Sequence, residues 1–141
     1  MILLGGNLLL YAHNTSSKEH APTTAWRDSA LSADGVCLSW ETILAFLRIA
    51  TTPRIFAKPL SLETAAAVID KWLAQPNVKI LSPTPRLWSI FSELLPSNRA
   101  RGSLIMDAHL AALAIEHGAT LCTNDRDFAR FPGLKLDFPL Q

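Results

Sequence analysis

Three aspartates fall in one short stretch of the sequence, at spacings that can bring them together. The stretch is Ser103 to Phe128 (SLIMDAHLAALAIEHGATLCTNDRDF), and it holds Asp107, Asp125 and Asp127. Carboxylate oxygens are ligands for hard divalent cations such as Mg²⁺ and Mn²⁺. Such a site would polarise a phosphate and lower the pKa of a bound water, so hydrolysis would need no Ser, Cys or His nucleophile. Phosphate is therefore the natural substrate for such a site.

The stretch predicts a helix, a buried strand and a loop. Ser103 is the predicted N-cap, and Gly118 is the predicted stop after a run of apolar residues at helical spacing. Asp107 then lies in the first turn, where the helix dipole favours its ionised form. Residues 119–122 predict the strand, and 124–127 the loop after it. Because ligands bind outside the carboxyl ends of parallel strands, the aspartates are expected to share one pocket.

A fourth acid, Glu41, has the same kind of position. A strand is predicted at 36–38, and Ser39 caps a predicted helix at 40–50, which places Glu41 in its first turn. Taken singly, each acid has an ordinary structural explanation. A carboxylate in a first turn is often only a partner of the helix dipole, and aspartates are common in turns.

Length and composition predict one globular domain over residues 1–141. The chain is 49% hydrophobic and 18% charged, which is enough apolar surface for one well-filled core. Helices and strands alternate along it. Further strands are predicted at 2–4, 78–81 and 134–138, and further helices at about 20–33, 62–73 and 87–95. Residues 7–12 predict an apolar turn or helix. This alternation predicts an α/β fold of three layers, with a mainly parallel central sheet flanked by helices.

Charge and cysteine content narrow the function classes. A net charge of +1 gives no overall attraction to nucleic acid, so any contact needs a local patch. Cys37 and Cys122 fall in predicted buried strands, which indicates reduced core residues in a cytoplasmic protein. The apolar start lacks a basic region and a cleavage site, and no run approaches the length of a membrane span. The four histidines show no zinc-ligand spacing with the cysteines.

Five arginines lie in the part of the sequence that includes Asp107, Asp125 and Asp127. They form either a groove for RNA phosphates or ordinary solvated surface, and the sequence leaves both open. These residues are Arg86, Arg99, Arg101, Arg126 and Arg130.

Four segments carry a family resemblance: NLLLYA after the first strand, SWETILAFLRI, DAHLAALA and TNDRDFARFPG. Together they closely resemble VapC-type toxins of the PIN-domain family, over essentially the whole chain. The resemblance implies a small α/β fold and an endoribonuclease that depends on Mg²⁺ or Mn²⁺. It also implies a homodimer and neutralisation by a cognate VapB-type antitoxin.

The resemblance also implies roles for individual residues. Asp127 resembles a further acid that binds metal or orients a water, and Asn7 and Thr123 resemble supporting residues. The residues that resemble the metal-site acids are Glu41, Asp107 and Asp125.

One position departs from the family pattern. The family places an Asp at the end of the first strand, in a D-x-N pattern, and this chain has Gly5 there. Two unit charges about 4 Å apart are worth roughly 4 kcal/mol at an effective dielectric near 20, so loss of one carboxylate weakens a cation site strongly. We therefore expect impaired metal-dependent cleavage. The alternative is a catalytically inactive PIN-like module that binds antitoxin or RNA. A phosphoacceptor receiver domain is a third candidate class. It would need paired acids after the first strand, and Gly5-Gly6 at that position disfavours it.

Overall fold

Five short strands form one sheet in the computed structural model, which describes residues 1–98 and 102–141. The strand order is β3-β2-β1-β4-β5, and every neighbouring pair is parallel. Each predicted strand is present within one residue of its predicted ends, and Cys37 and Cys122 are free and buried, as predicted. The strands are β1 (Ile2–Leu4), β2 (Val36–Leu38), β3 (Val78–Ile80), β4 (Thr120–Cys122) and β5 (Lys135–Asp137).

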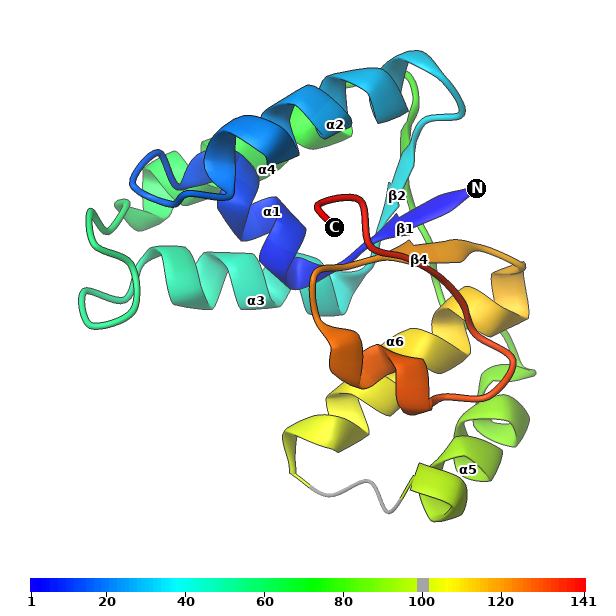
Figure 1. Cartoon of the computed structure of the whole chain (residues 1–141). Coiled ribbons are helices and arrows are strands. Elements are labelled where there is room, and N and C mark those ends of the chain that lie inside the picture. The colour runs from blue at the N-terminus through cyan, green and yellow to red at the C-terminus, as the bar shows by residue number, and fades with distance from the viewer. Residues whose placement is uncertain (99–101) are drawn as a thin grey trace.

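Helices cover both faces of the sheet. The described helices are α1 (Gly6–His13), α2 (His20–Ser32), α3 (Trp40–Ala50), α4 (Leu62–Leu73), α5 (Leu87–Asn98), α6 (Ser103–His117) and the 3₁₀-helix η1 (Arg126–Arg130). Successive strand residues point to opposite faces, so Leu4 packs with α1 to α4, whereas Leu3 packs with α5 and α6. Figure 1 shows α1 and α2 on one side of the strands and α5 and α6 on the other. The predicted three-layer α/β fold is confirmed. None of the described helices is long and apolar enough to cross a membrane.

Two helix ends differ from prediction. Gly102, and not Ser103, is the N-cap of α6, and no side chain caps this end. Asp107 therefore lies in the second turn, not the first. The helix predicted at about 87–95 is longer than predicted, because α5 continues through Pro96 to Asn98. Packing of the apolar face of α5 on α6, with Leu94 buried, maintains the helix despite the proline.

Helices α3 and α4 begin with the same cap, a serine whose side chain accepts a hydrogen bond from a threonine N–H three residues later. The pairs are Ser39 with Thr42 and Ser61 with Thr64, each at 3.1 Å. Only Thr42 is buried, and its hydroxyl also donates to the Leu4 carbonyl at 3.0 Å. This bond fixes the start of α3 against the end of β1.

Replacing Thr42 with valine is expected to cost about 1–3 kcal/mol of unfolding free energy, because it leaves the Leu4 carbonyl without this donor. The matched change Thr64→Val removes the equivalent threonine hydroxyl at an exposed site, where it only accepts from the Ser61 hydroxyl, and is expected to cost about 0.5 kcal/mol or less. Urea unfolding of both variants measures the difference. Equal losses would show that the bond to Leu4 contributes nothing.

Candidate active site

A cavity of about 380 Å³ lies beyond the carboxyl edge of the sheet. Strand β1 pairs with both β2 and β4, so the segments that follow these three strands meet there. Of the predicted acids, Glu41, Asp107 and Asp125 line this one cavity, and Asp127 does not. The lining residues are Gly6, Asn7 and Leu10 of α1; Glu41, Thr42, Ala45, Arg48 and Ile49 of α3; Ser103, Met106, Asp107 and Leu110 of α6; and Thr123, Asp125 and Phe128.

Asp107 lies half-buried in the cavity wall, close to other negative charges. Burial first, and then the charges of Asp125 and Asp127, raise the pKa of its carboxyl from 3.8 to about 6, although Arg130 opposes the rise. An ionised Asp107 is therefore repelled by the charges of Asp125 and Asp127, and Arg130 does not fully compensate for that repulsion. A bound cation would relieve that repulsion.

A hydrogen-bond network positions Asp125. The Asn7 side-chain amide donates to Thr123 Oγ1 at 3.3 Å, and its Oδ1 accepts from the Asn124 N–H at 3.2 Å. Thr123 Oγ1 accepts from the Asp125 N–H at 3.1 Å, and Asp125 Oδ1 accepts from the Asp127 N–H at 2.9 Å. Because Thr123 is buried, these bonds hold the loop after β4 in one orientation against α1.

Glu41 lines the cavity, but its carboxylate contacts a histidine. Its Oε1 lies against Nδ1 of His109 on α6, and the ring of Phe91 packs against the His109 imidazole with centroids 5.4 Å apart. Sequence reasoning considered His109 only as a zinc ligand and missed this role. No local signal marks it, because the contact joins two helices that are far apart in the chain.

The carboxylates suit a hard cation in chemistry and charge, but they do not converge. Within residues 1–98 and 102–141, no group of three or more His, Cys, Asp or Glu side chains is arranged to hold one metal ion. Glu41 contacts His109, and Gly5 contributes no side chain at the end of β1. Asp107 and Asp125 are the two lining acids left for a cation. Mg²⁺ is commonly held by one or two carboxylates, with water in its other positions.

A sequence model described as PIN domain matches residues 2–134. That match spans strands β1 to β4, the residues that line the cavity and every acid discussed above. The chain belongs to the PIN-domain family.

Relatives of this PIN domain extend over its whole length. It is 43% identical over 140 residues to Ribonuclease VapC37 of Mycobacterium tuberculosis, covering 99% of this chain and 97% of the relative. It is 39% identical over 142 residues to Ribonuclease VapC33 of the same species, covering 100% and 99%. The crystal structure of VapBC2 from Rickettsia felis, bound to a DNA fragment from their promoter, shares the fold. Its TM-score is 0.73 at 22% identity, covering 97% of this chain and 98% of that one. The predicted relation to VapC-type PIN domains is confirmed.

The arginines predicted for RNA binding lie outside the cavity lining or outside the described residues. Arg126 stacks its guanidinium 5.3 Å from the centroid of the Phe138 ring, and Arg130 lies 3.6 Å from Asp127. Arg86 is exposed before α5, and Arg99 and Arg101 lie outside the described residues. Their role in RNA binding stays a prediction.

The cavity lining does contain one arginine, Arg48, which sequence reasoning missed. Its spacing could have identified it, because Glu41, Ala45 and Arg48 follow one face of a helix.

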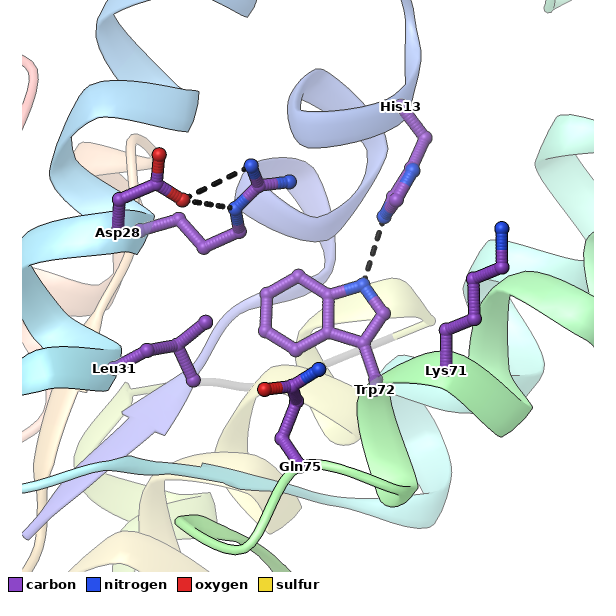
Figure 2. A pocket seen from close by; sticks show the side chains of 7 residues that line it. His13, Asp28, Leu31, Lys71, Trp72 and Gln75 are labelled. Carbon is purple, nitrogen blue, oxygen red and sulfur yellow. Dashed lines mark hydrogen bonds and ion pairs between the residues drawn. The ribbon is translucent and has the colours of Figure 1, made fainter.

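A second cavity of about 310 Å³ lies among α1, α2 and α4. Figure 2 shows Trp72 pointing toward His13, and the indole N–H donates to His13 Nε2 at 2.7 Å. Burial, together with nearby positive charges, lowers the pKa of His13 to about 4, so the ring stays neutral and accepts this bond. Asp28 is the one acid that lines this cavity, and it pairs with Arg27. The second cavity of the PIN domain is therefore lined by one acid, whereas the first is lined by three.

Proposed function

We propose that this PIN domain, acting as a single domain over residues 1–141, is the toxin of a type II toxin–antitoxin pair and hydrolyses RNA phosphodiester bonds. The observation that carries the proposal is the shared cavity of Glu41, Asp107 and Asp125 at the carboxyl edge of the sheet. The names of the full-length relatives, Ribonuclease VapC37 and Ribonuclease VapC33, support the same reaction. The proposed action on cellular RNA implies a cytoplasmic location.

Asp107 and Asp125 are the residues proposed to hold a Mg²⁺ or Mn²⁺ ion, with Glu41 as a further acid of the site. When bound, such an ion polarises the scissile phosphate and lowers the pKa of a bound water. Asn7 and Thr123 hold Asp125 in place through the network described above. Asp127 acts at longer range: its charge raises the pKa of Asp107, and its N–H donates to Asp125.

We further propose that Gly5 impairs the site without abolishing it. Gly5 is buried at the end of β1 and is the N-cap of α1. A Cβ built on it would lie 3.2 Å from Thr123 Cβ and 3.3 Å from Thr123 Oγ1, so a side chain at position 5 would face the Thr123 wall of the cavity. Water can replace one missing ligand of a hard cation, which supports weakened rather than absent binding.

The partners proposed are a VapB-type antitoxin and a second copy of the chain. The Rickettsia felis structure that shares this fold is named VapBC2 and is bound to a DNA fragment from their promoter, which supports a VapB-type partner. Burial first, and then repulsion from Asp125 and Asp127, raise the Asp107 pKa. The repulsion supports an inhibitory contact in which a basic antitoxin side chain enters the acidic cavity.

The proposal predicts RNA cleavage that needs added metal. Purified chain is incubated with structured and unstructured RNA in Mg²⁺, in Mn²⁺ or in EDTA. Cleavage is expected with either metal and not with EDTA. Asp125→Asn is expected to lower the rate by about tenfold or more, because a neutral amide is a weaker cation ligand and one carboxylate is worth at least about 1.4 kcal/mol there. Cleavage that persists in EDTA, or is equal in the variant, would point to a contaminating nuclease.

A catalytically inactive module that binds antitoxin or RNA is the second candidate. The absence of three converging ligands among the described residues favours it. It predicts stable complexes with antitoxin or RNA and no cleavage with any metal, even after an acid is restored at Gly5.

A further inference from the structure

One face of α3 contributes both an acid, Glu41, and an arginine without a described side-chain partner, Arg48, to the cavity lining. Glu41, Ala45 and Arg48 all line it, at positions that follow one face of the helix. Arg48 is seven residues after Glu41, which places it about 10 Å farther along the helix axis at 1.5 Å per residue. The guanidinium therefore lies on the same cavity as the acids, but away from the edge of the sheet.

Arg48 has no partner in the part of the chain that the structure describes. Its guanidinium makes no ion pair and no hydrogen bond there, and its backbone carbonyl accepts from the hydroxyls of Thr51 and Thr52. The side chain is exposed. Its N–H donors are thus free, in a fork that suits the oxygens of a phosphate.

The rest of this wall is apolar. Leu10 and Ile49 are half-buried, and the Met106 side chain is 55% exposed. The one aromatic ring among the described lining residues, Phe128, is only 5% exposed and offers little surface for stacking a base. A wall of this composition can contact a ribose and a phosphate, but it contains few groups that distinguish bases.

We propose that Arg48 binds an RNA backbone phosphate that neighbours the scissile one, and so positions the strand over Asp107 and Asp125. This inference rests on the proposed ribonuclease function and gives it a substrate-positioning residue. The contact supplies affinity and register and carries no sequence preference, because phosphates are the same at every nucleotide.

Salt-dependent RNA binding tests the proposal without any cleavage. Fluorescence anisotropy of labelled single-stranded RNA is measured in EDTA across a series of KCl concentrations. Arg48→Gln is expected to weaken binding roughly tenfold, since a hydrogen bond to a charged group contributes about 1.5 kcal/mol. It should also reduce the slope of log K against log salt by about 0.7, the value for one contact to a single strand. Arg48→Lys should keep most of the slope.

Arg54→Gln is the matched control, because Arg54 is exposed in the segment between α3 and α4 and does not line the cavity. Its effect on the slope is expected to be near zero. Equal slopes for Arg48→Gln and the unchanged chain, or an equal loss in the control, would overturn the proposal. So would an absence of measurable RNA binding.

Cleavage assays separate this inference from the proposed function. If the chain cleaves RNA and Arg48→Gln raises KM with kcat little changed, both stand. If the chain cleaves RNA and Arg48→Gln changes neither KM nor the salt slope, the Arg48 inference alone fails. If no metal supports cleavage but the slope still falls, the phosphate contact stands and the nuclease proposal fails.

Discussion

Gly5→Asp is expected to raise metal-dependent RNA cleavage by about one to two orders of magnitude. A carboxylate about 4 Å from a unit charge is worth roughly 4 kcal/mol at an effective dielectric near 20. Desolvation of the new carboxylate removes part of this gain, and about 1.4–2.8 kcal/mol of net stabilisation corresponds to about tenfold to hundredfold tighter cation binding. The effect is largest at metal concentrations below saturation.

The backbone of Gly5 permits this change, at a small steric cost. Its φ of −76° and ψ of 155° are open to any residue. A Cβ there would lie 3.1 Å from the Cys122 carbonyl oxygen, so strand β4 must shift by a few tenths of an ångström. An aspartate at the N-cap of α1 can also accept a hydrogen bond from the first turn, where Gly5 provides none.

Gly5→Asn is the control for these effects, because asparagine has the same shape, the same steric contact and similar capping ability, but no charge. Only the aspartate variant should gain activity and metal affinity, measured by cleavage rate against Mn²⁺ concentration and by calorimetric titration. A folded Gly5→Asp protein with no more activity than Gly5→Asn would contradict the proposed site and favour the inactive binding module.

Local signals in the sequence predict most of the fold. The start of α3 follows from Ser39, whose hydroxyl accepts from the Thr42 N–H, and the end of α6 follows from Gly118, which adopts a left-handed φ of 65°. Both devices act within one turn, so neighbouring residues suffice to identify them. The strand order needs a further step, since pairing of β1 with β4 joins segments more than a hundred residues apart.

The arrangement of the cavity depends on contacts that no local pattern contains. The sequence places Glu41 and Asp107 correctly at the carboxyl edge of the sheet, but the turn of Glu41 toward His109 depends on how α3 packs beside α6. The raised pKa of Asp107 likewise depends on the burial and neighbours that tertiary structure creates, whereas its helix position alone favours a lowered pKa. Prediction from helix position therefore gave the wrong direction for this group.

Asp107→Asn is expected to destroy cation binding and yet stabilise the metal-free fold above pH 6. The folded pKa of about 6 exceeds the ordinary 3.8, so the folded state disfavours the ionised carboxyl. Ionisation therefore lowers the free energy of unfolding as pH rises from 3.8 to 6. Asparagine removes this penalty. The shift corresponds to at most about 3 kcal/mol, and solvent screening of a half-buried group leaves about 1 kcal/mol.

Thermal unfolding in EDTA measures the gain, which is expected to be about 3 °C in Tm above pH 6 and to vanish below pH 4. Asp34→Asn replaces an exposed carboxylate before β2, outside the cavity, and is the control, which should give no such gain in Tm. Added Mn²⁺ should raise the Tm of the unchanged chain by mass action and leave Asp107→Asn unaffected. A variant that is less stable at all pH values would mean that Asp107 supports the fold rather than binding a cation. Stabilisation by Mn²⁺ that survives the substitution would place the ion elsewhere.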